Sequence, residues 1–136
     1  MVIDTSAIVA IARLEPEAAA FSGLLAATPD KIMAMPTYLE SVFVLAGLAP
    51  NKGVPFLEGI VADAGIELVP FGRRELDLAI EARLRYGRGA GHKARLNFGD
   101  CFSYALAKSR NLPLLFKGDD FTHTDVEPAL VVGKQA

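Results

Sequence analysis

The sequence predicts an α/β fold, a three-layer α/β/α sandwich around a central, mainly parallel sheet. Short apolar runs alternate with longer stretches of helical periodicity along the chain. Hydrophobic residues make up 51% and charged residues 22% of the 136 residues, a balance that suits one globular domain rather than a disordered chain. No linker, repeat or low-complexity tract interrupts this pattern, so residues 1–136 are expected to fold as one domain.

Four short apolar runs are predicted as strands and the segments around them as helices. The predicted strands are residues 2–4, 32–35, 66–71 and 113–116, and the predicted helices are residues 6–14, 15–27, 36–48, 54–65, 73–87 and 100–110. Thr5 or Ser6 can cap the first helix, Pro36 suits the first turn of the third, and Gly65 ends the fourth. A glycine-rich basic loop, residues 87–99, leads into the last helix.

Cysteine content and hydropathy indicate a protein of a reducing compartment with no membrane span. Cys101 is the only cysteine of the chain, so no internal disulfide can form. The longest apolar run, residues 42–49, is far short of the roughly 20 residues that span a bilayer. No basic region precedes the apolar start of the chain, as it would in a secretory signal. The formal net charge of −2 gives no overall attraction to nucleic acid, so any such attraction must be local.

Acidic side chains are predicted to gather at one edge of the sheet. Asp4 follows the first strand, Glu40 lies in the first turns of the helix after the second strand, and Asp100 begins the last helix. Asp119 and Asp120 follow the fourth strand. Because ligands bind beyond the carboxyl ends of the strands in parallel sheets, these carboxylates are expected at one rim. They would repel one another without a cation, and Mg²⁺ is an ion that takes such oxygen ligands.

Each of these acids also has a purely structural interpretation. Asp4 can cap the first helix, and Asp100 can interact favourably with the dipole of the last one. Glu40 in a helix is commonly a solvated charge, and residues 118–121, Gly-Asp-Asp-Phe, form a plausible turn. The spacing of the acids matches no local motif, so the pattern alone leaves both interpretations open.

Four stretches resemble the PIN-domain ribonucleases, and within them the VapC toxins of type II toxin–antitoxin pairs. They are MVIDTSAIVAI, PTYLES, RLNFGDCFSYALAKSRNLPLLFKGDDF and THTD, and the similarity runs from Met1 to about Asp125. The resemblance implies one PIN domain and a bacterial, cytoplasmic endoribonuclease that depends on Mg²⁺, with Mn²⁺ as a substitute. It further implies a homodimer, a cognate VapB-like antitoxin, and RNA substrates among which tRNA is frequent.

The PIN-like pattern assigns roles to the acids residue by residue. Asp4 matches the first acid of the family, Glu40 the second and Asp100 the third, whereas Asp119 and Asp120 are both candidates for the fourth. The resemblance therefore gives as catalytic candidates Asp4, Glu40, Asp100, Asp119 and Asp120, and as metal ligands Asp4, Asp100 and Asp119.

A basic segment before Asp100 is predicted to bind the RNA backbone. Residues 82–99 contain no Asp or Glu and carry five of the chain's 14 Lys and Arg residues. The candidates for substrate contact are Arg85, Arg88, Lys93 and Arg95, together with Thr5 and Ser6 beside the first acid, which are expected to orient its carboxylate or a metal-bound water. The structural alternative is a solvated helix end, where cations also interact favourably with the helix dipole.

The expected reaction is hydrolysis of RNA by a metal-activated water, in line at phosphorus, which leaves a 3′-hydroxyl and a 5′-phosphate. Glu40 would orient or deprotonate that water. The main alternative is a non-catalytic RNA- or protein-binding module of the same fold. A receiver-like phosphoacceptor domain would need a lysine near the pocket, for which Lys117 is the only candidate. A dehalogenase-type phosphatase would need Asp-x-Asp after the first strand, where this chain has Asp4-Thr5-Ser6.

Overall fold

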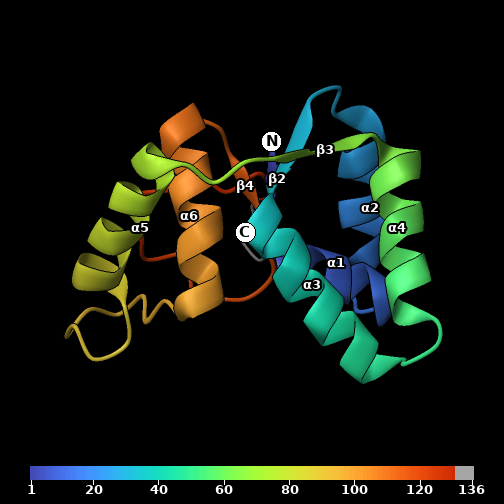
Figure 1. The fold of residues 1–136 in the computed structure, drawn as a ribbon, viewed down its shortest axis with the longest axis horizontal. Helices are drawn as coiled ribbons and strands as arrows, with labels where there is room; N and C mark the ends of the chain where they lie inside the picture. Colours follow the sequence, from blue (N-terminus) through green and yellow to red (C-terminus); the bar gives the residue numbers. More distant parts are fainter. Residues whose placement is uncertain (131–136) are drawn as a thin grey trace, which may run out of the picture.

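The structure, a computed structural model, describes residues 1–130, so the last six residues of the predicted domain lie outside the described part. Strands and helices alternate as the sequence predicts (Figure 1). The elements in chain order are β1 (Val2–Ile3), α1 (Thr5–Ala12), α2 (Ala18–Ala27), β2 (Lys31–Ala34), α3 (Met35–Leu48), α4 (Gly53–Ala64), β3 (Ile66–Val69), α5 (Arg73–Tyr86), α6 (Phe98–Arg110) and β4 (Leu114–Leu115).

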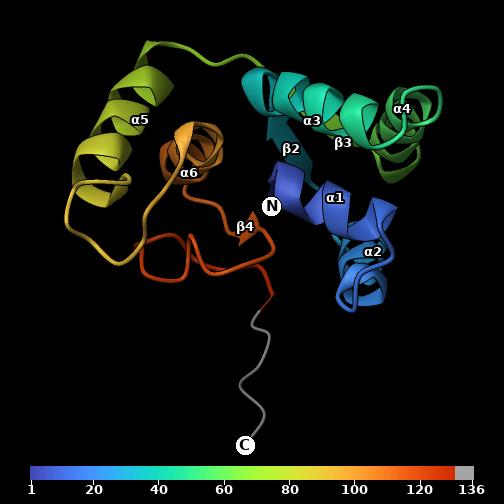
Figure 2. The ribbon, with the colours of Figure 1, turned by 90° about the horizontal axis from the view of Figure 1, so that it is seen from below.

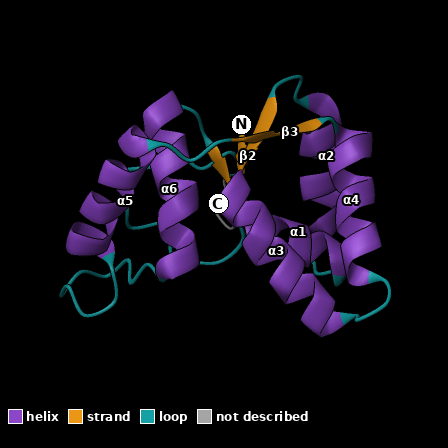
Figure 3. Cartoon of the chain, viewed as in Figure 1, coloured by secondary structure: helices purple, strands orange, loops and turns teal. Residues whose placement is uncertain are grey.

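The four strands form a parallel sheet in the order β3-β2-β1-β4, with β1 between β2 and β4. Figure 3 shows the strands in the middle of the molecule with helices to both sides. Val2 pairs with Ile32 on one side and with Leu114 on the other. Because the pairing is parallel, the carboxyl ends of β1, β2 and β4 open at the same edge. The chain then enters α1, α3 and the 117–120 loop from this edge, which places the predicted acids at one rim.

Helices cover both faces of the sheet, which confirms the three-layer prediction. Figure 2 shows α5 and α6 on one side and α1 to α4 on the other. Val2 belongs to the core under α5 and α6, together with Tyr104, whereas Ile3 belongs to the core under α1 to α4, together with Phe21. The alternation follows from strand geometry, since successive side chains point to opposite faces.

Several predicted boundaries were wrong by one to three residues, and local chemistry explains the differences. The helix predicted from Glu15 begins only at Ala18, because Leu14 adopts a left-handed conformation with φ 51° and the chain turns before α2. The strand predicted to reach residue 71 ends at Val69, since Pro70 has no N–H to donate to a sheet.

The last helix begins two residues earlier than predicted. Asn97 caps it by accepting a hydrogen bond from the Asp100 N–H at 2.9 Å, and the Asn97 N–H donates to the Asp100 carboxylate at 2.9 Å. This capping box places Phe98 in the first turn of α6. Within residues 1–130, no helix is long and apolar enough to cross a membrane.

Gly53 generates a prediction about stability, because α3 and α4 meet there. A Cβ on Gly53 would lie 3.1 Å from the Leu45 Cβ and inside the contact distance of the Leu45 carbonyl group. We expect Gly53→Ala to lower the free energy of unfolding by about 1–3 kcal/mol through overpacking, as measured by urea unfolding. The matched control is Gly47→Ala in α3, where no described atom lies within 4 Å of the added Cβ beyond those of its own helix and chain neighbours. That variant should gain up to about 1 kcal/mol from helix propensity, and equal stabilities would contradict the packing argument.

Candidate active site

Asp4 lies at the carboxyl end of β1, and two serines fix its side chain. Its backbone N–H donates to the Leu115 carbonyl at 3.0 Å, which ties it to β4. Ser6 donates to Oδ2 from its N–H at 3.0 Å and from its hydroxyl at 2.6 Å, and the Ser103 hydroxyl donates to Oδ1 at 2.5 Å. The residue is 3% exposed. Three donors from α1 and α6 therefore hold one buried carboxylate in a single orientation.

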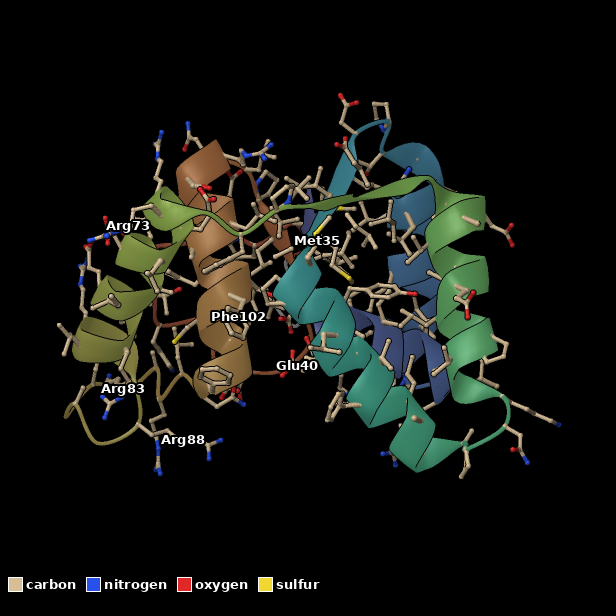
Figure 4. All side chains as sticks on the ribbon, in the orientation of Figure 1. Met35, Glu40, Arg73, Arg83, Arg88 and Phe102 are labelled. Atoms are coloured by element: carbon tan, nitrogen blue, oxygen red, sulfur yellow. The ribbon has the colours of Figure 1, made fainter. Side chains whose placement is uncertain are left out.

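Glu40 is held beside Asp4 by the first residue of α1. The Thr5 hydroxyl donates to Glu40 Oε1 at 2.7 Å, and its oxygen lies 2.9 Å from the Ser41 hydroxyl. Burial raises the pKa of Glu40, and the negative charge of Asp4 raises it further, against the opposing effect of the Thr5 hydrogen bond. Figure 4 shows Glu40 on the side of α3 that faces α6.

Gly99 allows α6 to approach this carboxyl group closely. A Cβ on Gly99 would lie 2.9 Å from Glu40 Oε1 and inside the contact distance of Glu40 Oε2. Any larger residue would push the glutamate away. The space available therefore explains the glycine before Asp100, which no pattern in the sequence indicated.

Asp100 is the third acid that the structure brings to this rim, and it is 8% exposed. Burial raises its pKa to about 7, and the charges of Asp4, Asp120 and Glu40 add to the rise, while the hydrogen bond from the Asn97 N–H opposes it. Two of these charges, Asp4 and Glu40, are 60 or more residues away from Asp100 in the sequence. The predicted gathering of acids is observed for these four.

The two neighbouring acids after β4 differ in their surroundings. Both are exposed, and the loop that carries them turns at Gly118, whose φ of 103° favours glycine. Asp120 is one of the charges that raise the pKa of Asp100. The backbone carbonyl of Asp119 instead accepts hydrogen bonds from the N–H of Thr122 at 3.1 Å and from its hydroxyl at 2.7 Å. The electrostatics therefore favour Asp120 as the fourth acid.

The residues present fit a hydrated hard cation rather than a closed metal cage. Within residues 1–130, no three Asp, Glu, His or Cys side chains form a group that could hold one ion between them. Mg²⁺ typically uses only one or two carboxylates and completes its octahedral shell with water and phosphate oxygens. The buried oxygens of Asp4 and Asp100, together with the mutual repulsion of the acids, suit an ion of this kind.

Sequence reasoning did not place Ser103 and Lys117 in the site. Ser103 lies three residues after Asp100 on the same helix, a spacing that puts both on one face and could have indicated it. Lys117, considered above as a phosphoacceptor lysine, does something else. Its backbone N–H donates to the Ser6 hydroxyl at 2.9 Å, and its ammonium pairs with Glu15 and lies 3.6 Å from Glu17 Oε1.

The four cations predicted to contact RNA are exposed, as that prediction requires, but they differ in the partners they already have. The Arg85 guanidinium lies 3.8 Å from Asp125 Oδ2 and 4.7 Å from the centre of the Tyr86 ring, so it already has partners. Arg88 Nε donates to the Arg95 carbonyl at 3.4 Å, which closes the loop on itself. Figure 4 shows Arg83 and Arg88 at the end of α5 from which this loop leaves. Lys93 and Arg95 are exposed on the loop.

Carboxylates at the carboxyl end of a parallel sheet supply oxygen ligands for a metal ion. Together with exposed cations nearby, they are typical of metal-dependent enzymes that cleave phosphodiesters.

Comparison with known proteins agrees with this interpretation. Residues 1–127 match the model of the PIN domain. The chain is 41% identical over 129 residues to Ribonuclease VapC42 of Mycobacterium tuberculosis, covering 95% of this chain and 98% of that protein. It is 44% identical over 130 residues to Ribonuclease VapC28 of the same species, covering 96% and 98%. The chain therefore belongs to the PIN-domain family, among the VapC ribonucleases.

Solved structures agree with this fold. One is VapC20 of Mycobacterium tuberculosis, described as a sarcin–ricin loop cleaving toxin, with a TM-score of 0.67, 17% identity, and 93% and 98% of the two chains covered. Another is VapBC2 of Rickettsia felis bound to a fragment of promoter DNA, with a TM-score of 0.72, 14% identity, and 93% and 95% covered. These structures confirm the predicted fold class, and the PIN-domain match and the VapC relatives confirm the predicted family.

Asp100 generates a prediction about pH. Its pKa of about 7 in the folded protein lies above the ordinary 3.8, so the folded state binds the proton more tightly. The stability that this gives is present below about pH 4 and is lost as the pH rises to 7. Without metal at pH 8, Asp100→Asn should therefore be more stable than the wild type by roughly 1–4 kcal/mol in urea unfolding, and the gap should close toward pH 4. Asp63→Asn, an exposed acid of α4, is the control, and a gap independent of pH would contradict the argument.

Lys117 generates a prediction about the 117–120 loop. Lys117→Met removes the ion pairs with Glu15 and Glu17 and should loosen the loop that carries Asp120. We expect amide hydrogen exchange at residues 117–120 to speed up by about tenfold, the effect of losing roughly 1.4 kcal/mol, while α6 exchanges as before. Lys52→Met, at the exposed start of α4, serves as the control. Unchanged exchange in the loop would show that the lysine does not hold it.

Proposed function

We propose that the chain is the toxin of a type II toxin–antitoxin pair and cleaves RNA with a bound Mg²⁺, for which Mn²⁺ can substitute. The observation that carries the proposal is the meeting of acids at one rim: the carboxylates of Asp4 and Asp100 are buried there, and Gly99, next to Asp100, packs against the Glu40 carboxyl group. Burial and the charges of these neighbours also raise the pKa of Asp100. Repelling carboxylates at a buried rim are what a divalent cation relieves. The names of the relatives, Ribonuclease VapC42 and Ribonuclease VapC28, support the same activity.

Asp4 and Asp100 would hold the ion, and Asp120 would complete the set of acids, with its neighbour Asp119 as the other candidate. When bound, Mg²⁺ supplies the positive charge that activates water and offsets the charge of the phosphate. The chain's own residues orient the reactants. Ser6 and Ser103 fix both oxygens of Asp4, so the carboxylate does not have to reorganise when the ion and the substrate bind.

Glu40 is the candidate for the group that accepts the proton of the attacking water. Thr5 holds its Oε1, and its Oε2 packs against Gly99, the residue before Asp100. Burial raises the pKa of Glu40 toward neutral pH, and a general base works best when its pKa lies near the pH of the reaction. Because the nucleophile is water and not the ribose 2′-hydroxyl, the products carry a 3′-hydroxyl and a 5′-phosphate.

Exposed cations beside the rim would hold the RNA backbone. Arg88, Lys93 and Arg95 lie on the loop before α6, and Arg85 could join them by leaving Asp125. Structured RNA such as tRNA is the substrate class we favour. A neighbouring structure described as a toxin–antitoxin complex from Klebsiella pneumoniae supports a VapB-like antitoxin as partner. A homodimer in the bacterial cytoplasm completes the proposal.

Asp4→Asn tests the activity. In the presence of Mn²⁺, the wild type should cut bacterial tRNA or ribosomal RNA. The variant should cut at least about 100-fold more slowly, with an unchanged circular dichroism spectrum. The cut ends should accept ligation at their 5′-phosphates, and excess chelator should stop the reaction. The exposed Asp63→Asn serves as the control.

Cleavage that persists in excess chelator, or that leaves 2′,3′-cyclic phosphates, would contradict the metal–water mechanism. A wild-type chain that binds RNA and never cuts it with Mn²⁺ would favour the alternative, a non-catalytic binding module of the same fold.

A further inference from the structure

A cavity of about 430 Å³ lies between the first turns of α3 and α6, and its largely apolar walls include three phenylalanines. Phe43 comes from α3, and Phe98 and Phe102 come from α6. Glu40 is the one charged side chain that the described part of the chain contributes to the lining. The same carboxyl group thus belongs to the cavity and to the acidic rim, so whatever occupies this slot lies next to the candidate active site.

The rings at the mouth of this slot lack covering side chains. Phe98 is 82% exposed and Phe43 is 73% exposed, unusual values for large apolar residues beside a buried site. The Phe98 ring touches Phe102 edge to face, with centroids 4.9 Å apart, and Phe102 touches Phe71 in the same way at 5.2 Å. Phe98 therefore packs on Phe102 with one edge, while most of its surface is exposed to solvent.

Phe98 and Asp100 lie close together in the same turn of α6. Both lie in the first turn of α6, which the reciprocal hydrogen bonds between Asn97 and Asp100 close. A group that stacks on Phe98 is consequently held at a set position relative to the buried acid, as a substrate subsite requires.

Two cations lie on the other side of the same ring, in a lining that is otherwise mostly apolar. Arg83 and Arg88, together with Phe98, line a second cavity of about 520 Å³ between α5 and α6. A chain of alternating phosphates and bases crossing this edge would meet positive charge on one side of Phe98 and an aromatic slot on the other.

We infer that the slot between Phe43 and Phe98 binds an unpaired base of the RNA substrate beside the cleaved bond. The inference rests on the proposed function. Its volume lies in the range of small-ligand pockets, and stacking of unpaired bases on aromatic side chains is a common means of RNA recognition. An apolar protein segment is the competing occupant. The position of Glu40 favours the substrate, since the group in the slot touches the residue that acts on the attacking water.

The test measures RNA binding by chains that carry Asp4→Asn, so that cleavage does not interfere. The probe is a short single-stranded oligoribonucleotide that spans the bond cut by the wild type. Phe98→Leu keeps an apolar side chain and removes the aromatic face, and it should raise the Kd about 5- to 100-fold. Phe98→Trp should bind as tightly as the parent. The matched control is Phe56→Leu, a half-exposed ring of α4 that lines a different cavity.

A series of abasic oligonucleotides locates the base. At one position of the oligonucleotide, removal of the base should raise the Kd of the parent by the factor expected for Phe98→Leu. Removal of that base should leave the Kd of the Phe98→Leu chain unchanged. A wild type that cuts RNA, combined with equal affinities of the parent and Phe98→Leu, would overturn this inference alone. Normal RNA binding by Phe98→Leu with altered self-association or antitoxin binding would assign the slot to a protein and overturn it as well. A wild type that cuts no RNA contradicts the proposed function, and the inference falls with it.

Discussion

The hydrogen bonds around the Asp4 carboxylate connect the separate parts of the site. Ser103 reaches it from α6 and Ser6 from α1, and the Ser6 hydroxyl in turn accepts from the Lys117 N–H after β4. Since the Asp4 N–H also bonds to Leu115, the central strand, two helices and the last loop meet at one side chain. Loss of this carboxylate would leave buried hydroxyl donors without their acceptor, at a cost of about 1–3 kcal/mol for each unsatisfied group. The same contacts that order the fold thus hold the candidate metal ligand in place.

The acidic rim works against folding stability, and the surrounding structure offsets this. Burial makes the charged form of Asp100 unfavourable, and three neighbouring acids add repulsion. Cooperative packing on both faces of the sheet, with Phe21 and Tyr104 fully enclosed, supplies the opposing free energy. A protein that needed only a stable fold would gain from a neutral side chain in place of Asp100. A charged Asp100 at this position is therefore expected from the proposed cation site and not from helix capping alone.

Periodicity and turn chemistry in the sequence were sufficient to predict the layers, the parallel sheet and the strand edge at which Asp4, Glu40 and Asp100 lie. Resemblance to the PIN domain then matched Asp4, Glu40 and Asp100 to the first, second and third acids of the family. What the sequence could not supply are contacts between residues far apart in the chain. Ser103 and Asp4 are 99 residues apart, and Lys117 and Ser6 are 111 apart, so no local pattern relates them. Nor does the sequence distinguish Asp119 from Asp120, which are neighbours after β4 and of which only Asp120 is among the charges that act on Asp100.

The separation of charges explains how a chain with a net charge of −2 can act on a polyanion. Residues 82–99 carry cations and no acid, whereas the acids of the site are buried or lie at the rim around Asp100. Exposed charges act within about one Debye length, near 8 Å at physiological ionic strength, so the approaching backbone responds to the nearest patch rather than to the whole protein. Repulsion by the rim remains until a cation occupies it. Binding of the ion and binding of RNA should therefore reinforce each other, because each removes the electrostatic cost of the other.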